Sequence, residues 1–171
     1  HRDLHSFPTR RSSDLFLRKP FVYTYNNVVL YIIGINILFF IAQNILDRPP
    51  FNPWFTWALA LNVNDVLQRG QVWAFVTYMF AHGGFQHLLF NMIGLFFFGT
   101  AVERRVGSSE FLLFYFTTGI LAGLTSFFVY LIGGAANVQL LGASGAVYAT
   151  LLAYAVFFPD SRIYIWGILP I

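Results

Sequence analysis

The sequence predicts an all-α, polytopic transmembrane helix bundle with four spans and the start of a fifth. Three observations predict it: an apolar composition, apolar stretches of membrane-spanning length, and short polar segments between them. Of the 171 residues, 57% are hydrophobic and only 10% are charged. Such a composition leaves too little polar surface to cover a soluble globule. We therefore expect a lipid bilayer to surround most of the chain.

The first fifteen residues, 1–15, differ from the rest because they are polar and basic and lack a hydrophobic period. Back-translated, they resemble a common short-read sequencing adapter read in one frame. We interpret them as an artefact that is not native and exclude them from the fold. Residues 16–171 form the remaining unit, in which His82 and His87 are the only histidines.

Three apolar stretches are long enough to cross a hydrocarbon core of about 30 Å at about 1.5 Å per residue. We expect these spans at residues 28–46, 85–102 and 111–132. None of the three contains a charged residue. The third carries Gly119 and Gly123 in a Gly-x-x-x-Gly spacing, which permits close helix packing.

A fourth apolar stretch, residues 145–158, has only fourteen residues before Pro159 ends it. A helix of this length covers about 21 Å, which is less than the bilayer needs. The loop before it is therefore expected to dip below the membrane surface, against protein or a water-filled cavity. A fifth apolar stretch, residues 163–171, looks like the start of another transmembrane helix.

The basic residues orient the bundle, because cytoplasmic loops beside membrane helices are enriched in Lys and Arg. With the N-terminus inside, the cytoplasmic basic residues from residue 16 onward are Arg18, Lys19, Arg104, Arg105 and Arg162, against Arg48 and Arg69 outside. We therefore expect an inside N-terminus, with Ser144 toward the outer face. The basic residues are dispersed and form no Lys/Arg-rich run, so a nucleic-acid partner is not expected.

Residues 47–86, between the first two expected spans, are too polar to cross a membrane and too aromatic for a plain loop. Amphipathic aromatic side chains are favoured in the headgroup region of a bilayer. We expect this segment to be an interfacial anchor.

His87 and Asn91 lie four residues apart near the start of the second expected span. They therefore share one helix face, on which Gly94 follows. Ionisable side chains inside a membrane are costly and usually functional. The alternative is that both residues only hydrogen-bond to neighbouring helices.

The segment Gly142-Ala143-Ser144-Gly145 leads directly into the short fourth helix. Unpaired N–H groups at a helix start carry the positive end of the helix dipole. They can stabilise the oxyanion that forms when Ser144 attacks a carbonyl. Flanking glycines let the backbone and a substrate approach closely. Taken alone, however, a Gly-x-Ser-Gly segment is also typical of helix packing.

Together, these motifs resemble the rhomboid family in residue type, order and spacing over residues 16–171. The motifs are His82, His87-Leu-Leu-Phe-Asn91, Gly99-Thr-Ala-Val-Glu103, and Gly142-Ala-Ser144-Gly145 followed by Tyr148. The resemblance implies a rhomboid-like bundle of six or seven helices and an intramembrane serine endopeptidase with Ser144 as nucleophile. It also implies that His87 and Asn91 help to form the oxyanion hole. The supporting residues would be Gly142, Gly145, His82 and Tyr148, the last packing against the catalytic histidine.

In the family, that histidine lies on the sixth helix, and no histidine follows His87 here. Residues 16–171 would then be the N-terminal part of the peptidase domain, and the chain alone would be inactive. One departure concerns the first loop, where rhomboids often carry a Trp-Arg pair and this sequence has Trp73-Ala74. Alanine there puts the architecture of the loop in doubt more than the catalysis.

The resemblance further implies that the substrates are single-span membrane proteins, cleaved by a Ser-His pair without a metal or an organic cofactor. The protein would be an integral multi-pass protein of a bacterial cytoplasmic membrane. Two other functions stay open. A catalytically dead rhomboid-like protein would bind membrane proteins without cutting them. A small channel or transporter would line a pathway with His82, His87 and Asn91, but such pathways usually carry several charged groups, and the expected spans have none.

Overall fold

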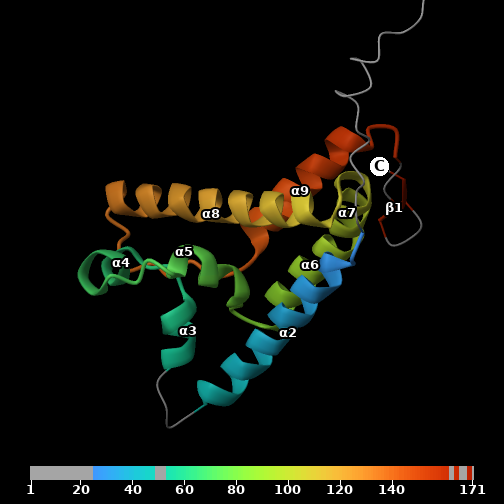
Figure 1. The fold of residues 1–171 in the computed structure, drawn as a ribbon. Coiled ribbons are helices and arrows are strands. Elements are labelled where there is room, and N and C mark those ends of the chain that lie inside the picture. The colour runs from blue at the N-terminus through green and yellow to red at the C-terminus, as the bar shows by residue number, and fades with distance from the viewer. Residues whose placement is uncertain (1–24, 49–52, 162–163, 166–168, 171) are drawn as a thin grey trace, which may run out of the picture.

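The computed structural model describes residues 25–48, 53–161, 164–165 and 169–170, and most of them lie in helices (Figure 1). Among the described residues, three helices are long and apolar enough to cross a membrane. They are α2 (Val28–Leu46), α8 (Ser108–Ile132), and a continuous helix made of α6 (Phe85–Gly94), the π-helical turn η2 (Leu95–Gly99) and α7 (Thr100–Val106). The predicted helical membrane bundle is therefore confirmed, whereas residues 1–15 lie outside the described residues.

The expected short fourth helix is α9 (Ser144–Phe157), which has 14 residues and begins and ends one residue earlier than the sequence suggested. It packs along α8 and also contacts α6, η2 and α7. In Figure 1, α9 crosses α8, and its far end rises above α8 and α7. These neighbours shield part of a helix that is too short to cross a bilayer alone, whereas Tyr148, Leu152 and Val156 on α9 are exposed.

The two glycines of the Gly-x-x-x-Gly spacing are buried on α8 and face the segment that precedes α6. The Tyr78 hydroxyl donates a 2.6 Å hydrogen bond to the carbonyl oxygen of Gly119. A Cβ at Gly119 would overlap Met79, and a Cβ at Gly123 would lie 2.9 Å from Tyr78 Cε1. Small residues therefore permit close packing here, as their spacing predicts.

Glu103 is a charged residue inside the second span, because that span continues through α7. We expected no charged residue inside the spans, and this expectation is wrong for the second span as the structure has it. Glu103 is fully buried, and its carboxylate accepts hydrogen bonds from Val28 N at 2.9 Å, Val29 N at 3.1 Å and Ser108 Oγ at 2.6 Å. A carboxylate is favourable at a helix N-terminus, where N–H groups lack intrahelical partners. Glu103 thus caps α2, and this structural role does not favour a transport pathway.

The segment between the first two spans folds as short helices: α3 (Trp54–Leu59), α4 (Val63–Arg69), α5 (Ala74–Thr77) and the 3-10 turn η1 (Tyr78–Phe80). Both α4 and α5 contact α8 (Figure 1). Trp54 and Trp57 are exposed, as an interfacial anchor requires, but Leu59 and Leu61 are buried in the core. The segment is therefore both a surface element and part of the packed bundle.

Ala74, which stands where rhomboids often have arginine, is fully buried in this first loop. The loop is held by two side chains beside it. Trp73 Nε1 donates to Ala58 O at 2.9 Å, and Thr77 Oγ1 donates to Leu59 O at 2.9 Å. The loop therefore has a defined architecture with alanine at this position.

Past α9, where the sequence suggested the start of a fifth helix, the described residues form two short strands. Strand β1 (Tyr164–Ile165) pairs antiparallel with β2 (Leu169–Pro170). The rest of residues 162–171 lies outside the described residues. Proline lacks the backbone N–H that a helix interior needs, so Pro170 in β2 does not favour a helix there.

Candidate active site

One cavity of about 430 Å³ lies between α6 and α9. Its lining residues are His87, Phe90, Asn91, Gly94 and Phe98 on one side, and Ser144, Val147, Tyr148 and Leu151 on the other. Four of the seven residues singled out in the sequence therefore meet in one place. Of the remaining three, Gly142 and His82 lie against the ring of His87, and Gly145 faces Ala122 of α8.

His87 and Asn91 reach the cavity from successive turns of α6. Asn91 is buried, and its Nδ2 donates to the carbonyl oxygen of His87 at 2.9 Å. A side-chain amide has two N–H protons, so the second remains available to a group in the cavity. Gly94 permits the close approach of α9, because a Cβ there would lie 3.0 Å from Val147 Cγ1.

Ser144 is the first residue of α9 and is half-buried. The N–H of Val147 donates to Ala143 O at 3.0 Å, so the N–H groups before it in the first turn have no acceptor within the helix. These groups and the helix dipole favour negative charge beside Ser144. Gly145 lets this end of α9 approach α8, since a Cβ there would lie 2.6 Å from Ala122 Cβ.

Gly142 connects the segment before Ser144 with α6. Its N–H donates to Tyr78 O at 2.9 Å, and its φ of 109° lies in a region that side-chain-bearing residues rarely adopt. A Cβ at this position would lie 2.5 Å from His87 Cε1 and 2.7 Å from His87 Nε2. The backbone of Gly142 therefore lies directly against the His87 ring, and only glycine permits this contact.

We expect Gly142→Ala to displace the His87 ring and lower turnover of the complete protein. The matched control is Gly134→Ala, because Gly134 also has a positive φ, 71°, but nothing lies within 4 Å of a Cβ there. Backbone strain of about 1–2 kcal/mol should lower the unfolding temperature of both variants. Both variants should therefore be less stable, but only Gly142→Ala should also have a lower turnover rate in its folded state. Equal turnover in the two variants would show that the contact with His87 has no functional role.

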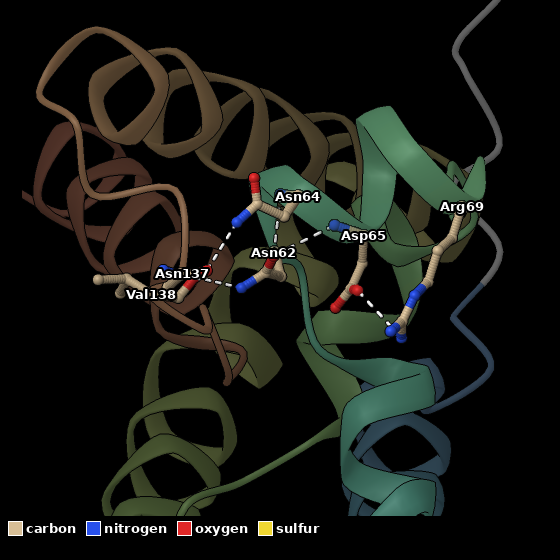
Figure 2. A network of polar contacts seen from close by, with 6 residues as sticks. All are labelled: Asn62, Asn64, Asp65, Arg69, Asn137 and Val138. Atoms are coloured by element: carbon tan, nitrogen blue, oxygen red, sulfur yellow. Dashed lines mark hydrogen bonds and ion pairs between the residues drawn. The ribbon is translucent and has the colours of Figure 1, made fainter.

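Two asparagines of the α4 region hold the segment that precedes Gly142 (Figure 2). Asn62 Nδ2 donates to Val138 O at 3.3 Å, and Asn64 Nδ2 donates to Asn137 Oδ1 at 2.6 Å. The Asn62 side chain also caps α4, accepting from Asn64 N at 2.9 Å and Asp65 N at 3.2 Å. One side chain therefore both starts α4 and ties it to the segment before α9.

Backbone hydrogen bonds reinforce this connection. Leu61 and Leu140 exchange two bonds, of 3.1 and 2.8 Å, as an isolated antiparallel bridge. Together with the hydrogen bond from Gly142 N–H to Tyr78 O, these two bonds hold the chain segment that leads to Ser144 against the first loop. Sequence reasoning missed this role; the Asn62-x-x-Asp65 pattern signals a helix start but not the distant partner.

His82 does not line the cavity at Ser144 but lies beside it. Its ring stands edge-on to the His87 ring, with 5.2 Å between centroids. Burial lowers the pKa of His82, so its ring is neutral at pH 7. His82 also lines a second cavity, of about 520 Å³, together with residues of α2 and α3. Tyr148, in contrast, is 71% exposed and lies on the open side of the first cavity.

The bundle combines apolar helices of membrane-spanning length with a short helix that packs among them. The serine at the start of this short helix lines a cavity. These features define a helical integral membrane protein with a serine-centred cavity. The family model described as Rhomboid domain matches residues 69–171. Rhomboid protease GluP of Bacillus subtilis (strain 168) is 33% identical over 133 residues, which cover 78% of this chain and 24% of that protein. Rhomboid protease GlpG of Salmonella choleraesuis (strain SC-B67) is 28% identical over 115 residues, covering 67% of this chain and 38% of that protein.

This chain belongs to the rhomboid family. It spans less than half the length of the two curated relatives that it matches here. The family assignment and the apolar helices together make it an integral membrane protein of an intramembrane protease family.

Proposed function

We propose that the complete protein is an intramembrane serine endopeptidase that cleaves single-span membrane proteins with Ser144 as nucleophile. The observation that carries this proposal is the cavity in which Ser144, His87 and Asn91 lie together at the start of a short helix. Each supplies a different part of acyl-transfer chemistry. The serine supplies an attacking oxygen, and the other two supply polar groups that can face the developing charge.

In the first step, Ser144 Oγ attacks the carbonyl carbon of the scissile peptide bond while a general base takes the hydroxyl proton. The carbonyl oxygen becomes an oxyanion, which is stabilised by the first-turn N–H groups of α9, the second N–H of Asn91 and the His87 ring. Collapse of this intermediate breaks the C–N bond, and the protonated base gives its proton to the leaving amine. Water then hydrolyses the acyl-enzyme by the same route.

The general base is assigned to a histidine that residues 16–171 do not contain. His87 lies against Gly142 and has the oxyanion role, while His82 is buried behind it. The resemblance to the rhomboid family supports a base on the sixth helix. The exposed ring of Tyr148, on the open side of the cavity, is the surface against which that histidine would pack.

The chain of 171 residues is therefore expected to have no serine-dependent protease activity, whereas the complete protein cleaves. The measurement compares both proteins on a single-span membrane substrate in proteoliposomes. Cleavage by the 171-residue chain that disappears on Ser144→Ala would show that the base is misassigned. Binding of the substrate by the complete protein without any cleavage would support the alternative of a catalytically dead binder.

The proposal places the protein in a bacterial cytoplasmic membrane with the N-terminus inside. Single cysteines test this orientation cleanly, because the chain has no cysteine of its own. Ser109 is exposed at the start of α8 and Gln139 is exposed in the segment between α8 and α9, whereas Ser108 is buried and hydrogen-bonded. In intact cells, an impermeant maleimide should label Gln139→Cys, but Ser109→Cys only after permeabilisation. Labelling of both from the outside would contradict the proposed topology.

A further inference from the structure

Gln43, near the end of α2, is buried, and its side-chain amide contacts both the N–H and the carbonyl oxygen of His82. The N–H of His82 donates to Gln43 Oε1 at 3.0 Å, and Gln43 Nε2 lies 3.5 Å from the carbonyl oxygen of His82 as its donor. One side chain thus satisfies the N–H of His82 and makes a longer, weaker contact with its carbonyl oxygen. Few side chains other than a primary amide carry a donor and an acceptor at this spacing.

The orientation of the Gln43 amide is fixed by Thr56 and Asp47. The Thr56 hydroxyl donates to Asp47 Oδ2 at 2.6 Å, so towards Gln43 it can only accept, and it does so from Nε2 at 2.7 Å. Asp47 is held in turn by the N–H groups of Phe55 and Thr56, at 2.9 and 3.0 Å. The Gln43 oxygen is therefore directed to the N–H of His82.

Contacts continue from His82 to the candidate active site. The His82 ring meets the His87 ring edge-on, and the His87 ring lies against the backbone of Gly142, two residues before Ser144. A shift of the His82 backbone would therefore move the support of His87. Nothing in the chemistry proposed above uses Gln43, Thr56 or Asp47 directly.

We propose that Gln43 is a positioning residue, which holds the loop at His82 so that the His87 ring keeps its place against Gly142. Thr56 and Asp47 set the orientation of its amide. This inference rests on the proposed function, because it concerns the placement of a group assigned to the oxyanion hole. Gln43 acts on the transition state through His87 and does not contact the substrate.

The test measures kcat and KM of the complete protein with Gln43→Met, which keeps the length of the side chain and removes its two hydrogen bonds with His82 and the one to Thr56. We expect kcat to fall by about 10-fold to 10²-fold, because a 1 Å misplacement of a catalytic group can cost roughly 10²-fold in rate. KM should change less than about twofold. The matched control is Asn44→Met, at the adjacent exposed position, whose amide bonds only to Phe40 O within the described part of the chain. It should keep kcat.

Variants of Thr56 provide a second test of the proposal, which can be carried out even if Gln43→Met fails to fold. Thr56→Ser keeps the hydroxyl and should keep kcat, whereas Thr56→Val should lower it. Because both residues act in one network, Gln43→Met combined with Thr56→Val should be no slower than Gln43→Met alone.

Unchanged kcat in Gln43→Met, or equal kcat in Thr56→Ser and Thr56→Val, would overturn the positioning role, whatever the unfolding temperatures. Failure of the proposed function has a different signature, because the unmodified protein would then show no cleavage that depends on Ser144.

Discussion

Ser144→Ala is expected to abolish both substrate cleavage and fluorophosphonate labelling of the complete protein. The serine is the proposed nucleophile, so its removal leaves no group to form the acyl-enzyme. The expected loss in kcat is on the order of 10⁶-fold, as when the serine of a catalytic triad is removed. The measurements are turnover of a single-span substrate in proteoliposomes and labelling by the probe.

The control is Ser126→Ala, because Ser126 lies within α8 and does not line the cavity at Ser144. This variant should cleave and label as the unmodified protein does. Cleavage by Ser144→Ala at an undiminished rate would show that another group is the nucleophile.

Asn91→Ala is expected to lower kcat by about 10²–10³, the usual effect of losing one oxyanion donor, while labelling by the probe survives. The matched control is Asn44→Ala. Both asparagines donate Nδ2 to the carbonyl four residues earlier, at 2.9 Å in Asn91 and 2.8 Å in Asn44, but only Asn91 lines the cavity. Comparable kcat values in the two variants would remove Asn91 from the oxyanion hole.

His87→Ala should lower kcat in the same range, with one further effect. The ring contacts both Gly142 and the His82 ring, so its loss also leaves a gap and lowers the unfolding temperature. Asn91→Ala deletes a smaller side chain and should lower that temperature less.

Hydropathy and length were sufficient to predict the membrane-spanning helices and the short helix α9, but not the short helices of the first loop. The expected first span coincides with α2, and the short fourth helix is displaced by only one residue. The end of the second span was not predictable, because a charged residue normally ends an apolar span. Glu103 continues the helix because three donors, two of them at the start of α2, satisfy its carboxylate. That arrangement exists only once the helices have packed.

The candidate site was predictable where it depends on local spacing. His87 and Asn91 share a face because they lie one helical turn apart, and Ser144 begins a helix directly after the small residues Gly142 and Ala143. The approach of the two helices depends on packing at Gly94 and Gly142, which spacing does not reveal.

The polar network around the site could not be read from the sequence either. Nothing in the sequence distinguishes Asn62, Asn64 and Gln43 from other polar residues. Their partners lie between 39 and 76 residues away, at Val138, Asn137 and His82. Such bonds depend on tertiary structure, since no local pattern specifies a distant hydrogen-bond partner.

The most direct measurement of the central claim is the site of covalent modification in the complete protein. The folded protein is labelled in its membrane with a fluorophosphonate and digested, and the modified peptide is sequenced by mass spectrometry. We predict a single adduct on Ser144, absent when the protein is unfolded before labelling, because an isolated serine hydroxyl is a weak nucleophile. An adduct on a different residue, or serine-dependent cleavage with Ser144 unmodified by the probe, would contradict the assignment of Ser144 as the nucleophile.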